Sequence, residues 1–145
     1  MITITIIYLP FLERRLNVAT IKYSQQREAI KQYLAQTHEH PTADTIYTKL
    51  REIFPHISLG TVYRNLNLLV EQGEIIKLTC GDGSDHFDYN VDQHYHFLCK
   101  ECGAILDLDL DPLEEVNKLA STNFPGEIGG HNALFYGKCK ECLEK

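Results

Sequence analysis

The stretch HYHFLCKEC at residues 94–102, taken together with CKEC at residues 139–142, decides how this chain folds. Each CxxC pair offers two thiolates at a spacing that lets one tight turn present both sulfurs to a single ion. Two such turns complete a closed site with no position left for a substrate. The sequence therefore predicts a structural zinc bound by Cys99, Cys102, Cys139 and Cys142. Disulfides or free thiols are the alternative, and no secretory signature favours disulfides.

The length and the start of the chain bound what the protein can be. Its 145 residues suffice for one core or two small ones, and no apolar run is long enough to span a membrane. The first ten residues, MITITIIYLP, lack the basic region and the small-residue cleavage site of a signal peptide, so we expect a cytoplasmic protein. Residues 1–20 could be an extra strand, an irregular arm or an artificial extension, and the sequence leaves that choice open.

The acidic charge is concentrated in the C-terminal half. The formal net charge is -6 overall, which by itself argues against a nucleic-acid partner. Residues 1–90 hold nine Lys/Arg and ten Asp/Glu, a net of -1, whereas residues 91–145 hold five and ten, a net of -5. The N-terminal half therefore remains free to contact phosphate locally.

Hydrophobic spacing predicts three helices before residue 74. Ser24, Thr42 and Ser58 are the expected N-caps, and Gly73 is the expected stop of the third helix. The apolar residues expected to face inward on the second helix are Ile46, Leu50 and Ile53. Residues 75–80 and 85–89 flank a Gly-Asp-Gly-Ser turn and are predicted to form a β-hairpin. Helices arranged in this way, followed by a hairpin, match a winged helix-turn-helix, so residues 1–90 are predicted to be a DNA-binding domain.

Residues 91–145 have a different pattern. Strands are expected at 94–99, 104–110 and 128–136, and a helix is expected at 111–124 with Leu113, Val116 and Leu119 facing inward. A unit of this size usually needs a metal or a second subunit for stability. We therefore predict an α+β protein in which an α/β dimerisation and metal-binding domain, carrying the Cys₄ zinc, follows the winged helix.

A second metal site is predicted beside the zinc. His94 and His96 alternate by two, so on a strand both imidazoles project from one face. His40, Asp88 and Asp107 would complete a shell of three nitrogens and two oxygens, which suits Fe(II), Mn(II) or Zn(II). Taken singly, each of these residues could equally be a surface polar group.

Five motifs are distinctive: HPTAD at 40–44, SLGTVYRNLNLL at 58–69, HFDY at 86–89, HYHFLCKECG at 94–103 and YGKCKEC at 136–142. Together they resemble the ferric uptake regulator (Fur) family. The resemblance runs from about residue 20 to the end. It implies a repressor that binds palindromic operator DNA as a homodimer, has no enzymatic activity and does not associate with a membrane. It also implies zinc on the four cysteines and a regulatory Fe(II) or Mn(II) on the five His and Asp residues.

With aspartate at position 107, the chain resembles the peroxide-sensing branch of that family, since iron-sensing members usually carry glutamate there. The resemblance then implies that Fe(II) reduces hydrogen peroxide, and that the oxidant formed attacks His40 or His94. Metal loss would open the domains and end repression. The alternative is an iron- or other metal-responsive repressor that does not sense peroxide. Iron regulators often have a third site as well, but this chain has Gln93 and Tyr95 at two of its positions.

The outer face of the third helix carries the expected DNA contacts. Tyr63 and Arg64 are predicted to read base edges and thymine methyl groups, and Arg27, Thr61 and Asn67 to bind phosphate. Packing against the preceding helix is the alternative for Tyr63. Arg64 is more similar to iron regulators, because several peroxide sensors have asparagine there.

Two other classes of function could use some of these residues. A non-haem iron oxygenase or hydrolase built on His94, His96 and Asp88 would need open coordination positions and a substrate cavity. A zinc-stapled interaction module would bind no DNA. Outside these sites, Cys80 is expected to be a small, partly buried residue. The resemblance leaves His131 without its usual partners of the third site, so it is expected to be an ordinary polar residue, with indirect support of the metal region as the alternative. His38, His56 and His86 are expected on the surface.

Overall fold

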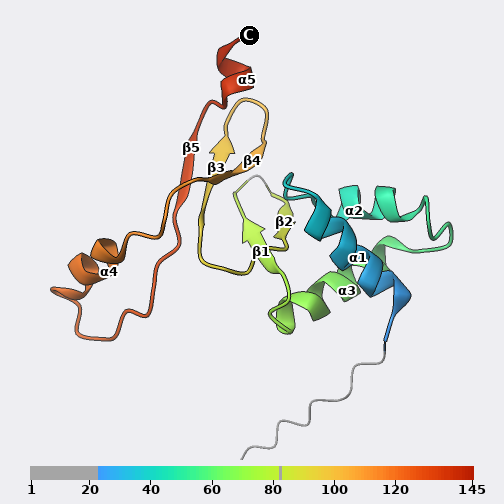
Figure 1. The fold of residues 1–145 in the computed structure, drawn as a ribbon, viewed down its shortest axis with the longest axis horizontal. Coiled ribbons are helices and arrows are strands. Elements are labelled where there is room, and N and C mark those ends of the chain that lie inside the picture. Colours follow the sequence, from blue (N-terminus) through green and yellow to red (C-terminus); the bar gives the residue numbers. More distant parts are fainter. Residues whose placement is uncertain (1–22, 82) are drawn as a thin grey trace, which may run out of the picture.

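The computed structural model describes residues 23–81 and 83–145. The expectations for residues 1–20 therefore lie outside the described residues. The fold is α+β, as predicted, with a helical N-terminal part followed by a β-rich C-terminal part (Figure 1). Among the described residues, no helix combines the length and the apolar character needed to span a bilayer. The domain boundary at residue 90 remains a prediction.

The N-terminal part begins with three helices whose caps were predicted. Ser24 Oγ accepts a hydrogen bond from the Arg27 N–H, and Thr42 and Ser58 accept equivalent bonds from residues three positions along the chain. Gly73 ends the third helix with a φ of +68°, a conformation that L side chains rarely adopt. The elements are α1 (Gln25–Gln36), α2 (Ala43–Leu50), α3 (Leu59–Glu71) and the antiparallel strands β1 (Ile76–Thr79) and β2 (Asp85–Asp88).

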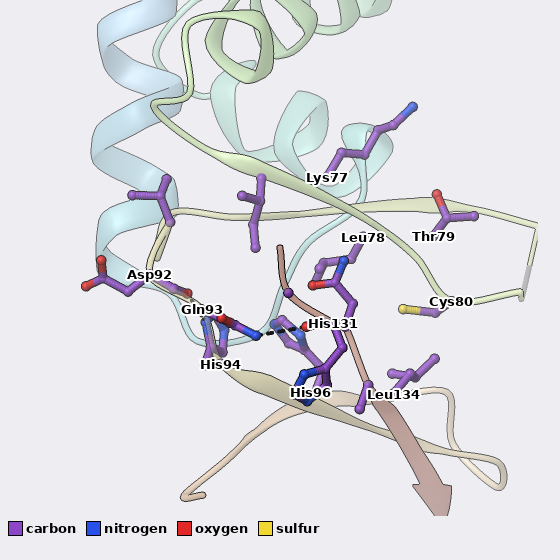
Figure 2. Close-up of a pocket in the computed structure, with 15 residues that line it drawn as sticks. Lys77, Leu78, Thr79, Cys80, Asp92, Gln93, His94, His96, His131 and Leu134 are labelled. Carbon is purple, nitrogen blue, oxygen red and sulfur yellow. Dashed lines mark hydrogen bonds between the residues drawn. The ribbon is translucent and has the colours of Figure 1, made fainter. Parts of the chain in front are cut away.

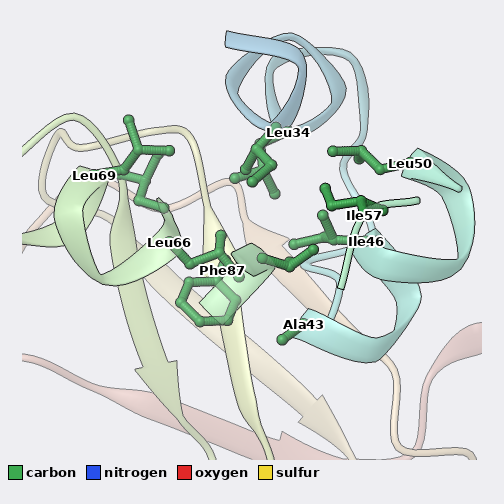
Figure 3. Packing of buried hydrophobic residues seen from close by; sticks show 11 residues of the cluster. Leu34, Ala43, Ile46, Leu50, Ile57, Leu66, Leu69 and Phe87 are labelled. Atoms are coloured by element: carbon green, nitrogen blue, oxygen red, sulfur yellow. The ribbon is translucent and has the colours of Figure 1, made fainter. Parts of the chain in front are cut away.

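The core of this part lies where the three helices meet the hairpin (Figure 3). Phe87 of β2 is buried among side chains from all three helices, including Leu34, Ile46 and Leu66. Each fully buried side chain of this kind contributes about 1.5–3 kcal/mol. Because Phe87 is followed by Asp88, this packing also fixes one predicted metal ligand.

The prediction that Ile53 faces the core is wrong. Helix α2 ends at Leu50, and Ile53 is 69% exposed. The N–H groups of Glu52 and Ile53 bond to carbonyls only three residues back, and this tighter winding rotates Ile53 away from the apolar face. Ile57, which follows Pro55, is buried in its place.

The C-terminal part is a three-stranded sheet in the order β4-β3-β5. Strands β3 and β4 are antiparallel, whereas β3 and β5 are parallel, with Cys99 opposite Gly137. The elements are β3 (Tyr95–Cys99), β4 (Ile105–Leu108), α4 (Glu114–Ser121), β5 (Leu134–Gly137) and α5 (Lys140–Leu143). The short helix α5 was not predicted.

Two predicted elements are shorter than expected. The strand expected at 128–136 is formed only at Leu134–Gly137, because Gly129 and Gly130 disfavour a strand. The helix expected at 111–124 begins at Glu114, since Pro112 keeps the residue before it out of the helical region. Its apolar residues are not covered within the described chain: Leu113, Val116 and Leu119 are 44%, 41% and 78% exposed.

The two parts of the chain meet beside the sheet. Leu78 and Cys80, from and just after β1, pack against Leu98 of β3 and Ile105 of β4. Cys80, expected to be partly buried, is buried. This contact brings the hairpin close to the strands that carry the other predicted ligands.

Candidate metal centres

The structure brings the five predicted His and Asp ligands together. His40 lies just before α2, Asp88 ends β2, His94 immediately precedes β3, His96 lies within β3, and Asp107 lies in β4. One ligand atom from each lies within 4.8 Å of the other four. Residues from the helical part, the hairpin and the sheet thus meet at one point.

The spacing of these atoms is that of ligands around one ion. Asp88 Oδ2 lies 3.4, 3.0 and 3.4 Å from the Nε2 atoms of His40, His94 and His96. Asp107 Oδ1 lies 2.9, 3.3 and 3.6 Å from the same three nitrogens. Adjacent ligands that are each about 2.1 Å from a common metal are about 3 Å apart in octahedral geometry. The cluster therefore fits a single transition-metal ion.

The hydrogen bond of His94 prepares its other nitrogen to bind a metal. His94 Nδ1 lies 2.7 Å from the carbonyl oxygen of Asp92, and because a carbonyl only accepts, Nδ1 carries the proton. In the neutral ring, Nε2 then presents a lone pair toward two carboxylates. His94 Nε2 and both ring nitrogens of His40 are buried, and the two Nε2 atoms face the carboxylates of Asp88 and Asp107. A cation would satisfy lone pairs that face one another in this way.

The backbone at His40 is held in an unusual conformation. Its φ is +47°, in the left-handed region, which costs about 1–3 kcal/mol for a residue other than glycine. His86 Nδ1 donates to the His40 carbonyl over 2.8 Å, and Phe87 N–H donates to the Pro41 carbonyl over 3.1 Å. His86, expected on the surface, is half-buried and supports the backbone of a predicted ligand. Its alternation with Asp88 on one strand was the signal that could have placed it near the site.

The electrostatics of the cluster favour a cation. Burial acts to raise the pKa of Asp88, but hydrogen bonds to His40 and His96 outweigh it and hold that pKa well below its usual range. Burial likewise acts to lower the pKa of His40, yet Asp88 and Asp107 raise it overall. Asp88 is consequently ionised at neutral pH, and its charge attracts positive charge to the site.

The four predicted cysteines form a second cluster. Their Sγ atoms lie within 4.8 Å of one another, and those of Cys102 and Cys139 are 3.8 Å apart. Four sulfurs at about 2.3 Å from a tetrahedral zinc are about 3.8 Å apart. All five cysteines lie within the described residues, and none forms a disulfide. The cluster therefore suits a structural zinc.

Backbone geometry assembles the four thiols. Cys99 ends β3, and Gly103, with a φ of +74°, turns the chain so that Cys102 faces back. Cys139 caps α5 and donates its N–H to Cys99 Sγ over 3.3 Å. Backbone N–H groups of Cys102 and Cys139 lower the pKa of Cys99 to about 6. Hydrogen bonding within the cluster, above all with Cys139, raises the pKa of Cys142 to about 12, so the full set of thiolates needs a metal.

The predicted DNA contacts lie on or near the outer face of α3. Arg64 and Asn67 are exposed, and Tyr63 is 40% exposed, so its ring is not enclosed by the preceding helix. Thr61 is half-buried, and its hydroxyl lies 2.9 Å from Ser58 Oγ at the helix cap. Arg27 is half-buried on α1. Their role in DNA binding remains a prediction.

A cleft opens beside the His and Asp cluster (Figure 2). It has a volume of about 700 Å³ and lies between β1, the segment at 91–94 and the segment at 130–134. His94, His96 and His131 line it. His131 is not an isolated polar residue, because its ring contacts Tyr95 and Asn117. The family resemblance links His131 to positions 93 and 95 of the third site, but no sequence signal points to Asn117.

Comparisons with known proteins agree with the two clusters. A profile of the ferric uptake regulator family matches residues 18–132. The peroxide-responsive repressor PerR of Staphylococcus aureus is 42% identical over 130 residues, which cover 90% of this chain and 88% of that protein. The crystal structure of the Campylobacter jejuni peroxide stress regulator is similar, with 32% identity and a TM-score of 0.69, over 81% of this chain and 88% of that one. The ferric uptake regulator of Helicobacter pylori has 25% identity and a TM-score of 0.75, over 86% and 83% of the two chains.

Proposed function

This chain belongs to the ferric uptake regulator family of transcriptional repressors, and from that membership we propose that it represses genes in the presence of Fe(II) or Mn(II) and releases them when hydrogen peroxide is present. Proteins of this family regulate transcription and are not enzymes. The observation that carries the proposal is the cluster of five ligand atoms that joins the helical part to the sheet.

A bridging site of this kind works as a switch. His40 comes from the helical part, Asp88 from the hairpin, and the other three ligands from the strand region of the C-terminal part. A metal that needs all five binds tightly only when these parts are closed on each other. To convert a mostly open population into a mostly closed one, the difference in affinity must reach about 5.5 kcal/mol. Five coordination bonds can supply a difference of this size.

The closed form is proposed to act as a homodimer, since regulators of this family bind operator DNA as dimers. Exposed apolar side chains of the C-terminal part support this assembly. They are Leu106, Leu110, Leu113, Val116, Leu119, Leu134 and Phe135. Two copies of α3 would then enter successive major grooves of a palindromic operator. Tyr63 and Arg64 would contact bases, and Arg27, Thr61 and Asn67 would contact phosphates.

Peroxide sensing is proposed to act through the imidazoles. When bound, Fe(II) would supply the electrons that start the reduction of peroxide; overall, one peroxide oxygen is added to a ring carbon of His40 or His94 and the other leaves as water. His94 lines the larger cleft, and His40, Asp88 and Asp107 line a smaller one of about 140 Å³. An oxidised imidazole binds metal poorly, so the metal would dissociate and would no longer stabilise the closed form.

Two observations favour peroxide sensing over simple metal sensing. The position on β4 is held by Asp107, whose side chain is 40% exposed, and a short carboxylate arm leaves room at the ion. The 42% identical relative is named as peroxide-responsive. The alternative remains a repressor that responds to iron or another metal alone, and Arg64 is the residue that favours it.

The test compares two metals in one assay. Protein loaded with Fe(II) or Mn(II) is bound to a palindromic DNA fragment that the manganese-loaded protein has selected from a random pool, and peroxide is then added. Loss of DNA binding with Fe(II) but not with Mn(II), together with one added oxygen on a peptide containing His40 or His94, is the expected result. Unchanged mass with metal-dependent binding would favour the simple metal sensor.

A further inference from the structure

Helix α4 stands apart from the strands, at the end of two long connections (Figure 1). None of its residues is buried by the described part of the chain. Its apolar side chains therefore do not hold it in place within one subunit. Two polar contacts tie it to the sheet region: the Leu113 N–H donates to Tyr95 Oη over 2.9 Å, and Asn117 Oδ1 lies 2.8 Å from His131 Nδ1.

Tyr95 lies at the centre of these contacts. Its side chain is 1% exposed, and its hydroxyl lies 2.5 Å from His131 Nε2. Gln93 Nε2 donates to the His131 carbonyl over 2.8 Å, the bond dashed in Figure 2. Gln93 and Tyr95 occupy positions that alternate with His94 and His96, so successive side chains serve either the metal cluster or His131.

The donors and acceptors fit in one direction. An amide N–H only donates, so the Tyr95 hydroxyl accepts a hydrogen bond from the Leu113 N–H and donates one to His131 Nε2. Neutral His131 then carries its proton on Nδ1 and donates it to Asn117 Oδ1. This chain of hydrogen bonds runs from the start of α4 through Tyr95 of β3 and His131 back to α4, and every donor in it has an acceptor without an added ion. Connected hydrogen bonds of this kind strengthen one another.

We infer that Tyr95, His131 and Asn117 form a hydrogen-bonded brace that couples α4 to the strand carrying His94 and His96. The three act as positioning residues, because none of them is a ligand in the five-residue cluster. The inference rests on the proposed function in two respects, namely that the cluster binds a metal and that α4 meets a second copy of this chain. Metal binding and correct placement of α4 would then favour each other reciprocally.

The test uses the full chain with zinc retained and the regulatory site emptied. Mn(II) affinity is measured by titration calorimetry for wild type, Tyr95→Phe, Asn117→Ala and the double variant. Tyr95→Phe removes one oxygen and keeps the buried ring. We expect about tenfold weaker binding for Tyr95→Phe and a smaller loss for Asn117→Ala. The double variant should bind no more weakly than Tyr95→Phe, because both changes break the same chain of hydrogen bonds.

Lys118→Ala is the matched control, since Lys118 is an exposed residue of the same helix. It should bind Mn(II) like the wild type. Wild-type affinity in Asn117→Ala, or losses that simply add in the double variant, would overturn the brace. Zinc content that stays constant in every variant shows that the fold is kept.

A second measurement separates the brace from the proposed function. If the wild type itself bound no Mn(II), the proposed function would fail, and hydrogen exchange would still test the brace. The amides of residues 113–121 should exchange faster in Tyr95→Phe and Asn117→Ala than in Lys118→Ala. Equal exchange in all three variants would reject the brace regardless of metal binding.

Discussion

The two clusters differ in where their ligands come from. The four cysteines all belong to the C-terminal part, at the end of β3, the turn after it, and α5 beside β5. The five His and Asp ligands are drawn from the helical part, the hairpin and two strands. A cluster within one part contributes to folding, whereas a cluster that joins two parts controls their arrangement. The same kind of chemistry thus suits a structural role in one place and a regulatory role in the other.

Removal of one cysteine is expected to have the largest effect. Cys139→Ser removes one sulfur ligand at the N-cap of α5. The chain should therefore lose its zinc, and the three-stranded sheet should unfold. The binding free energy of a structural zinc, on the order of 10 kcal/mol, is then no longer available for folding. Zinc content and urea unfolding followed by circular dichroism measure the effect.

The control for this change is Cys80→Ser, which alters a buried cysteine outside the cluster. That variant should retain one zinc per chain. A Cys139→Ser protein that kept its zinc and unfolded like the wild type would show that the cysteine cluster has no structural role.

Removal of Asp107 should affect the His and Asp cluster without affecting the cysteine cluster. Asp107→Ala takes away one carboxylate on β4, so Mn(II) affinity should fall by at least about a hundredfold, while zinc content and the unfolding midpoint stay unchanged. Asp109→Ala is the matched control, because Asp109 is an exposed carboxylate two residues further along. Equal Mn(II) affinity in the two variants would contradict a metal role for Asp107.

The features that were predictable from the sequence are local ones. Ser24, Thr42 and Ser58 cap helices through bonds to residues three positions away, and the hairpin follows from its glycine-rich turn. The ligands were identifiable because their residue types and short spacings carry chemistry by themselves. The motifs also resembled a known family, and the family profile confirms that resemblance.

The features that were not predictable depend on contacts between distant residues. The bond from His86 to the His40 carbonyl spans 46 positions, and the one between Tyr95 and His131 spans 36. Strands β3 and β5 pair in parallel and carry cysteines of the cluster at or just after their ends, and periodicity does not reveal such a pairing. The exposed apolar residues of α4 were predicted to face the core, because helical spacing of apolar residues indicates a covered face without showing what covers it.

The pH dependence of the metal-depleted regulatory site offers a smaller effect. The pKa of Asp88 is lowered, so its contribution to stability exists above the unfolded value near 3.8 and is lost as the pH falls below it. The pKa of His40 is raised, so its contribution exists below the unfolded value of 6.5 and is lost as the pH rises through the higher folded value. The zinc-loaded protein should therefore have its highest urea midpoint between the two unfolded pKa values, 3.8 and 6.5.

Replacement of Asp88 tests this assignment. Asp88→Asn cannot ionise, so the loss of stability between pH 6 and pH 8.5 should be smaller than in the wild type, as measured by urea midpoints at each pH. The four cysteines contribute equally in both proteins and cancel. An unchanged pH profile in Asp88→Asn would show that the pair does not stabilise the closed arrangement.

The smallest effect should come from the apolar contact between the two parts. Leu78 of β1 packs against Cys80, Leu98 and Ile105, so Leu78→Ala removes part of the contact that favours closure without touching a ligand. A loss of about 1 kcal/mol would weaken Mn(II) binding by about fivefold, because less of the metal-free protein is closed. Calorimetry should show this loss in Leu78→Ala but not in Thr79→Ala, an exposed neighbour on the same strand. Unaltered Mn(II) affinity in Leu78→Ala would mean that the five ligands alone determine the closed state. The difference between the cysteine cluster and the His and Asp cluster would then depend only on which parts of the chain supply the ligands.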